Sequence, residues 1–432
     1  MWAPEPFDLA RCPKKRVTVE VDSTPPSNFA RSVKWSPDGS AILAQCENSS
    51  FRLYLSGEED NILANSNQTT KVFSQASPVL DFTWFPTASV YDPASFCFAA
   101  SVRECPVKLL DASDGRLRAS YPIVDHRERQ IAPHSLAFNL TAQRLYCGFE
   151  NAIEVFDVSR PGEGTRIRTT PHKKSKDGLK GIVSALAFSP TYGAEESYFA
   201  AGSFTPSNNN IGLFSDSQDE PLMFLGGGPR AGVTQIQFNP AKPHILYASY
   251  RGSGTGSIFS WDIRSNIDIP IDIFETAGLA IAKTNQKLRF DVDLAGRMLG
   301  VGTISIFQFD TEVRSEERGM QINEPEFRTH KPTLQFKAHN DVTGSVAFHP
   351  FKPLLLSASG SRHFTSYEDT DPASDEDAER DPSKKTQHNR LQPKIFDSSV
   401  SIWNFANTPE MASSGSDVQE GQGGEDGILQ VK

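Results

Sequence analysis

The chain has 432 residues and a formal net charge of −10, with 38% hydrophobic, 22% charged and 10% aromatic residues. This apolar fraction supports a sizeable core and excludes a wholly disordered chain. No apolar run approaches the ~20 residues that span a bilayer, so no membrane partner is expected. Thirty glycines and 29 prolines indicate many turns, and 29 phenylalanines against five methionines favour strands over helices.

The first ten residues hold prolines and acidic residues rather than an apolar stretch, so no signal peptide is expected. The five cysteines match no zinc or redox spacing. We therefore predict free thiols in a reducing compartment, nuclear or cytosolic, and no metal site.

The negative charge is concentrated in two segments. Residues 368–381 carry eight acidic residues and one Arg, and residues 408–432 carry five acidic residues and one Lys. The remainder of the chain has a net charge of +1. The total charge therefore does not exclude an anionic partner such as RNA.

One pattern recurs at intervals of 49 to 56 residues. It consists of a strand that ends in a large apolar residue, a turn with Pro, Asp or Gly, a strand of small residues, and a strand that ends near an aromatic–Asp pair. The equivalent ends of the first strand are Trp35, Trp84, Phe138, Phe188, Phe238, Val292 and Phe348. The spacing is compatible with WD40 or kelch units, and Trp261-Asp262 favours WD40. We predict an all-β fold, a seven-bladed WD40 β-propeller over residues 17–405, whose sheets cover one another.

Three segments fall outside the repeats. Residues 1–16 are expected to form a polar arm, and residues 366–393 are an acidic and polar insert in the last blade, expected to be disordered. Residues 406–432 are expected to be a disordered tail. Residues 17–21 alternate as a strand would, so they either close the ring or belong to a loose arm. Ser374, ahead of three acidic residues, is a candidate phosphorylation site, with a solvated loop as the alternative.

No Walker, HExxH or GxSxG motif is present, so neither an enzyme nor a cofactor is predicted. His339 and His349 fall at repeat positions and are interpreted as structural rather than as metal ligands. No small-molecule substrate is expected.

The strongest functional signal is a basic segment. Residues 160–180 contain seven Lys or Arg against two acidic residues, and they include Lys173, Lys174 and Lys176. Such clusters attract phosphates through counterion release, although many are only solvated linkers. The loop residues Arg103, Arg251 and Arg362 are predicted to lie on one rim of the propeller and are further candidate RNA contacts.

Several motifs resemble the telomerase Cajal body protein family. Residues 102–121 read VRECPVKLLDASDGRLRASY, close to the family pattern SRExPIxxWDAxTGxLRAS followed by Phe or Tyr. Residues 134–138, 145–149, 224–227, 261–264, 284–286 and 357–362 match in the same order. The resemblance covers residues 29–405, and departures such as Leu110 in place of Trp indicate a diverged member.

The resemblance implies a non-enzymatic scaffold that binds a short box in the terminal loop of box H/ACA small Cajal body RNAs. It also implies ribonucleoprotein proteins as partners and, in some lineages, telomerase RNA as a bound RNA. The implied location is nuclear, with a cytoplasmic pool as an open alternative. Lys173-Lys174 matches a Lys-Lys pair of the family. The alternatives are an accessory factor of spliceosomal ribonucleoproteins or a protein-only WD40 adaptor in a chromatin or ubiquitin-ligase complex.

Overall fold

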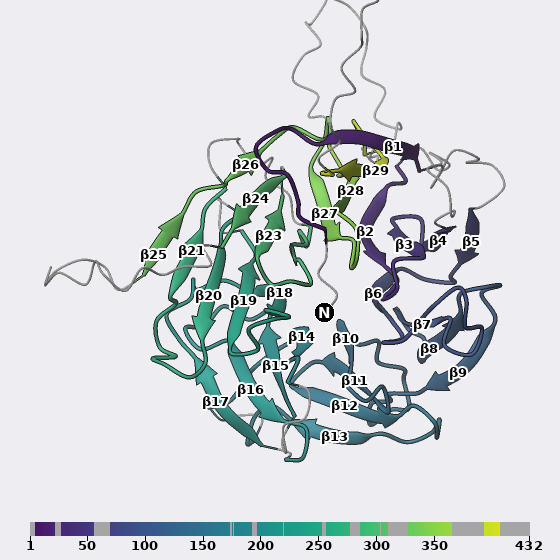
Figure 1. Cartoon of the computed structure of the whole chain (residues 1–432). Helices are drawn as coiled ribbons and strands as arrows, with labels where there is room; N and C mark the ends of the chain where they lie inside the picture. Colours follow the sequence, from purple (N-terminus) through teal and green to yellow (C-terminus); the bar gives the residue numbers. More distant parts are fainter. Residues whose placement is uncertain are drawn as a thin grey trace, which may run out of the picture.

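The computed structural model describes residues 5–21, 27–55, 70–172, 175, 177–191, 197–218, 220–252, 256–276, 286–302, 304–309, 327–364 and 393–406. Every regular element in these ranges is a β-strand. The strands form seven sheets of four or five strands arranged in a ring (Figure 1). The predicted seven-bladed, all-β propeller is confirmed.

Each blade is a sheet that runs from an inner to an outer strand. Blade one contains β2 (Ala30–Trp35), β3 (Ala41–Cys46), β4 (Ser50–Leu55) and β5 (Lys71–Ser74). Blade two contains β6 (Val79–Trp84), β7 (Cys97–Val102), β8 (Val107–Asp111) and β9 (Leu117–Tyr121). Blade three contains β10 (Ser135–Phe138), β11 (Arg144–Phe149), β12 (Ala152–Asp157) and β13 (Thr165–Arg168). Blade four contains β14 (Val183–Phe188), β15 (Tyr198–Ser203), β16 (Ile211–Ser215) and β17 (Pro221–Leu225).

The three remaining blades all depart from simple chain order. Blade five contains β18 (Val233–Phe238), β19 (Ile245–Tyr250), β20 (Ile258–Asp262), β21 (Asp272–Phe274) and a parallel fifth strand, β25 (Arg328–His330). Blade six contains β22 (Asp291–Val292), β23 (Met298–Val301), β24 (Ser305–Gln308) and β26 (Leu334–Gln335). Blade seven contains β27 (Thr343–Phe348), β28 (Leu354–Ser359), β29 (Ser399–Asn404) and β1 (Lys14–Glu20). In all seven blades the first strand ends at the residue that the repeat pattern identifies.

The ring is closed by the N-terminal strand. β1 pairs antiparallel with β29, so that Val17 lies opposite Ile402 and Val19 opposite Val400. Both valines pack against the apolar cluster between blades seven and one. Of the two alternatives left open for residues 17–21, ring closure is the one that the structure shows, and the strand starts earlier, at Lys14.

The segment ahead of β1 also packs on the propeller. In Figure 1 the chain crosses from β1 toward the centre of the ring. The ring of Phe7 lies 5.5 Å from that of Phe348 and 5.3 Å from that of Phe405, centroid to centroid. The Asp8 backbone N–H donates a hydrogen bond to the Phe405 carbonyl. The expected polar arm thus contributes apolar contacts to blades six and seven.

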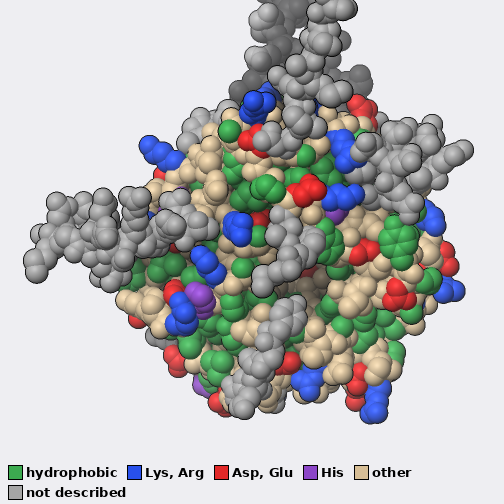
Figure 2. Space-filling model, in the orientation of Figure 1, with side chains coloured by type: hydrophobic (Ala, Val, Ile, Leu, Met, Phe, Trp, Pro, Cys, Tyr) green, Lys and Arg blue, Asp and Glu red, His purple; other side chains and the backbone are tan. Residues whose placement is uncertain are grey.

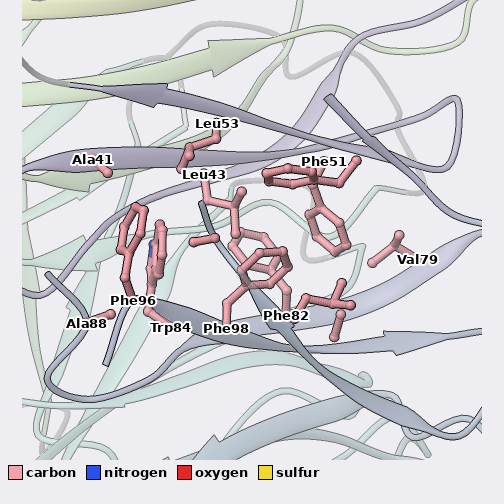
Figure 3. Packing of buried hydrophobic residues seen from close by; sticks show 14 of the residues in the cluster. Ala41, Leu43, Phe51, Leu53, Val79, Phe82, Trp84, Ala88, Phe96 and Phe98 are labelled. Atoms are coloured by element: carbon pink, nitrogen blue, oxygen red, sulfur yellow. The ribbon is translucent and has the colours of Figure 1, made fainter. Parts of the chain in front are cut away.

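Apolar packing is confined to the interfaces between blades. The described residues form seven apolar clusters, one at each interface between neighbouring blades. Figure 3 shows the cluster between blades one and two, where Phe51 meets Phe82 and Phe98 edge-on, with ring centroids 5.5 and 5.0 Å apart. Small residues of the second strands, such as Ala99 and Ala100, are fully buried and allow neighbouring sheets to approach closely.

The alternating strand directions produce two different faces. The turn face carries the turns between first and second strands, for example residues 36–40 and 349–353. The connection face carries the turns between second and third strands and the links between blades, for example residues 47–49, 75–78 and 103–106. Loops that come from distant parts of the sequence therefore share a face.

The predicted disordered insert and tail, together with Ser374, lie outside the described residues. At the base of the insert, His363 and Lys394 exchange two backbone hydrogen bonds of 2.9 and 2.8 Å. The insert therefore begins and ends at neighbouring points on the connection face.

His349 is buried on the turn face, which confirms the prediction that its role is structural. Its ring packs on Trp35, with centroids 4.7 Å apart. Its Nδ1 accepts the backbone N–H groups of Phe351 and Lys352, both at 3.0 Å. Burial, followed by the charge of Lys352, lowers the pKa of His349 to about 4. The neutral ring is thus part of the interface between blades seven and one.

Deletion of residues 1–21 removes the fourth strand of blade seven. We expect this variant to unfold at a melting temperature lower by roughly 10 °C or more, because two apolar clusters lose one side. Deletion of residues 407–432 should leave the melting temperature unchanged within about 2 °C. Differential scanning fluorimetry of the full chain and both deletions checks this, and equal losses in the two deletions would contradict it.

Replacement of His349 should alter the pH dependence of stability. The ordinary pKa is 6.5 and the folded value about 4, so the unfolded chain takes up this proton first as the pH falls. Wild-type stability should therefore fall between these two values. His349→Asn should be less stable at pH 7 but show a smaller decline over that interval. Urea unfolding of both proteins at several pH values measures this, and parallel pH profiles would contradict it.

Candidate nucleic-acid interface

The three predicted rim arginines lie on the connection face. Arg103 and Arg251 occupy the same structural position, the first residue after the second strand of their blades. The Arg103 backbone N–H donates to Pro78 O at 3.0 Å, and the Arg251 N–H donates to Gly232 O at 2.8 Å. Arg362 follows the second strand of blade seven by three residues. The strand topology thus places three residues that are distant in sequence on one face.

Two of these arginines contact a residue of the neighbouring blade. The guanidinium of Arg251 lies over the Phe204 ring, 5.1 Å from its centroid, and Arg362 pairs with Glu47. Burial, and then the charges of Lys287 and Arg103, lower the pKa of His134. Arg251 and Arg362 are therefore positioned by contacts across the seams between blades.

Glu47 neutralises part of the positive charge at the seam between blades seven and one. Its carboxylate pairs with Arg362 and, at 3.4 Å, with Arg31. The side chains of Arg362 and Arg31 are 53% and 40% exposed, whereas that of Glu47 is 11% exposed. Two exposed guanidinium groups thus share one carboxylate that is almost fully covered.

The basic segment includes β13 and the link from blade three to blade four. Lys173, Lys174 and Lys176 themselves lie outside the described residues. The base of their loop is closed by Thr169 and Leu179: the Leu179 N–H donates to Thr169 O at 2.8 Å, and the Thr169 hydroxyl donates to Leu179 O at 2.6 Å. This base lies on the connection face, the same face as the three arginines.

Two further cations lie across the central channel and were not predicted from the sequence. Lys287 Nζ donates to the carbonyls of His134 and Ser184, at 3.4 and 3.3 Å. Arg289 pairs with Asp81 at 3.4 Å. Burial, and then the charge of Arg289, lower the pKa of Lys287 to about 8. No spacing or motif marks these residues, because their partners come from other blades.

Below these cations, the first strands line a channel of about 480 Å³. Asp291 lies in it and accepts hydrogen bonds from Gln237 Nε2 and from the Phe348 N–H, both at 2.8 Å. Burial raises the pKa of Asp291 to about 6 despite these bonds. Lys34 also lines the channel and donates to Phe82 O at 2.6 Å. The charges of the channel thus have partners within the fold.

A hydrogen-bond network in blade seven connects four side chains from three segments. Trp403 Nε1 donates to the Ser357 hydroxyl at 2.9 Å, and His339 Nε2 lies 2.7 Å from the same oxygen. His339 Nδ1 lies 3.6 Å from an Asp397 oxygen. Hydrogen bonds from His339 and Ser399 hold the pKa of Asp397 below its usual range although burial opposes this. The structural interpretation of His339 is confirmed.

On the face that Figure 2 shows, Lys and Arg side chains are scattered singly among acidic and hydrophobic ones. Among the described residues, no group of three or more His, Cys, Asp or Glu side chains is placed to hold a metal ion. The search for membrane spans finds no helix of sufficient length and hydrophobicity in the described ranges. The five cysteines are free thiols.

The fold is a WD40-repeat β-propeller. It has seven radial blades, a strand from the opposite terminus that closes the ring, and a Trp–Ser–His–Asp hydrogen-bond network. A scan against models of protein families gives no match. The chain is 31% identical over 417 residues to telomerase Cajal body protein 1 of Bos taurus, with 94% of this chain and 70% of that protein covered. It is 30% identical to telomerase Cajal body protein 1 of Homo sapiens, with 94% and 69% covered.

The chain belongs to the telomerase Cajal body protein 1 family, as a diverged member. It is also 29% identical over 296 residues to guanine nucleotide-binding protein negative regulator 1 of Schizosaccharomyces pombe, with 66% of this chain and 71% of that protein covered. The resemblance that residues 102–121 carry is thereby confirmed.

Proposed function

We propose that this chain is a non-enzymatic, RNA-binding scaffold of nuclear small ribonucleoproteins, and that RNA lies on the connection face. One observation carries the proposal: the topology gathers Arg103, Arg251, Arg362 and the base of the basic loop on a single face. A face with several exposed cations attracts a polyphosphate chain and releases its counterions. Lys287 and Arg289 add positive charge near the axis of the same face.

The roles of the cations differ with their surroundings. Lys173, Lys174 and Lys176, in a loop without apolar neighbours from residue 172 to 178, are proposed phosphate contacts. An exposed arginine can present a planar guanidinium to a base or a phosphate. Arg251, over the Phe204 ring, and Arg103 are the proposed base-reading residues.

The proposed RNA class is supported by the names of the relatives. Its members carry telomerase and the Cajal body in their names, which supports box H/ACA small Cajal body RNA as the ligand, with telomerase RNA as a narrower candidate. Ribonucleoprotein proteins are the proposed partners and the nucleus, at Cajal bodies or in the nucleoplasm, the proposed location. A spliceosomal accessory role uses the same face with a different RNA.

A second candidate function is that of a protein-only adaptor. It is favoured by the similarity to a protein named as a regulator of a guanine nucleotide-binding protein. Cross-linking in cells followed by sequencing of the bound RNA distinguishes the two functions. An adaptor would yield no RNA above the background of an unrelated propeller.

Charge reversal in the basic loop tests the phosphate contacts. The triple variant Lys173→Glu, Lys174→Glu and Lys176→Glu should bind a labelled H/ACA terminal hairpin at least about tenfold more weakly at moderate salt. Its affinity should also depend less steeply on salt, because fewer counterions are released. Fluorescence anisotropy over a salt titration measures both quantities.

The matched control reverses Lys71, Lys242 and Lys352, which lie toward the turn face. These three changes alter the net charge equally and should leave RNA affinity within about threefold, since long-range charge effects are screened by salt. Equal affinities of the wild type and the loop variant at every salt concentration would remove the loop from the interface.

Neutralising Glu47 should strengthen RNA binding. Glu47→Gln keeps the shape of the side chain but releases Arg31 and Arg362 from their shared carboxylate. We expect about a two- to tenfold gain in affinity and a steeper salt dependence, by about one released ion. The control is Asp114→Asn, in the turn between β8 and β9 on the turn face, because it changes the net charge by the same amount. Weaker binding by Glu47→Gln than by Asp114→Asn would contradict the assignment of Arg362.

A further inference from the structure

A second polar cavity lies where the two ends of the propeller meet. The cavity measures about 500 Å³ and is bounded by β1, the link between β26 and β27, residues 395–398 ahead of β29, and Ser399 at the start of β29. This volume falls in the range of about 300–1,000 Å³ that is usual for ligand pockets. Its lining includes Lys15, Lys337, Asn340 and Phe396. We call it the closure cleft.

Phe396 gives the closure cleft an exposed aromatic surface. Phe396 is 63% exposed, although it lies only three residues before β29. The His363 ring lies on it, with centroids 4.2 Å apart at an angle of 37°. With one side of Phe396 against His363, the exposed remainder of its ring is available to a planar group.

A buried carboxylate fixes this aromatic pair. The Asp341 side chain is 1% exposed, and its Oδ1 lies 2.8 Å from His363 Nε2. Its Oδ2 accepts the Phe396 backbone N–H at 3.3 Å and the Ser361 N–H at 3.2 Å. The aromatic surface is thus positioned before any ligand arrives, which lowers the entropic cost of binding.

The closure cleft is lined by two lysines and two carboxylates, so its lining as a whole has no net charge. Lys15 and Lys337 are both exposed, and Lys15 Nζ lies over the Trp403 ring, 5.4 Å from its centroid. The Asp397 carboxylate already accepts the Asn340 and Ser399 N–H groups, at 2.8 and 2.9 Å. The two exposed ammonium groups are therefore the local contacts that the cleft offers to an anionic group.

We propose that the closure cleft binds one nucleotide of single-stranded RNA, with its base stacked on Phe396 and its phosphates near Lys15 and Lys337. Exposed aromatic rings beside cations are the usual means by which proteins hold unpaired bases. The Asn340 side chain offers an amide donor and acceptor to the edge of the base. Segments that form the cleft also belong to the connection face, so a strand on that face can continue into it. This assignment rests on the proposed RNA-binding function.

The test compares two phenylalanines at the base of the insert. Phe396→Ala removes the ring in the cleft, whereas Phe364→Ala removes a ring of similar exposure, 61%, that is not part of the cleft lining. The full chain and both variants are titrated with a labelled H/ACA terminal hairpin by fluorescence anisotropy and cross-linked to it with ultraviolet light. Melting temperatures verify that the variants are folded.

Phe396→Ala should bind RNA at least fivefold more weakly with an unchanged salt dependence, because stacking carries no charge. It should also lose the RNA cross-link in the peptide that spans residues 393–398. Phe364→Ala should stay within twofold of wild type. The double variant Lys15→Glu and Lys337→Glu should weaken binding and lower the salt dependence.

Wild-type affinity and cross-links in Phe396→Ala would overturn the cleft assignment. If the basic-loop variant loses binding at the same time, the proposed RNA-binding function stands and only the cleft is wrong. If the wild-type chain binds no RNA, both proposals fail. Loss of a co-purifying protein instead of RNA from Phe396→Ala would assign the cleft to a protein partner and also overturn the proposal.

Discussion

The need of every blade to bury both faces of its sheet determines the rest of this structure. A four-stranded sheet has no second layer of its own, so its apolar side chains are covered only by its two neighbours. The seven apolar clusters accordingly lie between blades, and the central channel is lined by both polar and apolar side chains of the first strands. The ring is complete only when blade seven has all its strands. β1 is therefore part of the core, although it comes from the other end of the chain.

Two networks of buried polar groups are compatible with this packing because their members are held by several partners. His339, Ser357, Trp403 and Asp397 satisfy one another within blade seven. Asp341 likewise collects donors from three loops. Burying such groups is costly unless they are hydrogen-bonded, so these networks specify how the loops sit on the sheets. The loops of the connection face consequently present their exposed side chains from a rigid base.

The seam between blades seven and one combines closure with the proposed function. The pairing of β1 with β29, the ion pairs of Glu47 and the closure cleft all lie at or beside this seam. The cleft exists only because the N-terminal strand lies against blade seven. RNA binding and ring closure are therefore expected to be coupled, since a ligand held by Lys15 and Phe396 joins segments from both ends of the chain.

The number of blades, the ends of their first strands and the family could all be read from the amino-acid sequence, because a sheet repeat has a local pattern of apolar, small and turn residues. The same pattern identified His339 and His349 as structural residues and placed Arg103, Arg251 and Arg362 on one rim, since their offset from a strand is readable. The folded structure was needed to show that the N-terminal strand closes the ring, that Glu47 pairs with Arg362, and that Lys287 and Arg289 lie across the channel. These contacts join residues far apart in the chain, and their geometry depends on how the blades pack rather than on any local pattern.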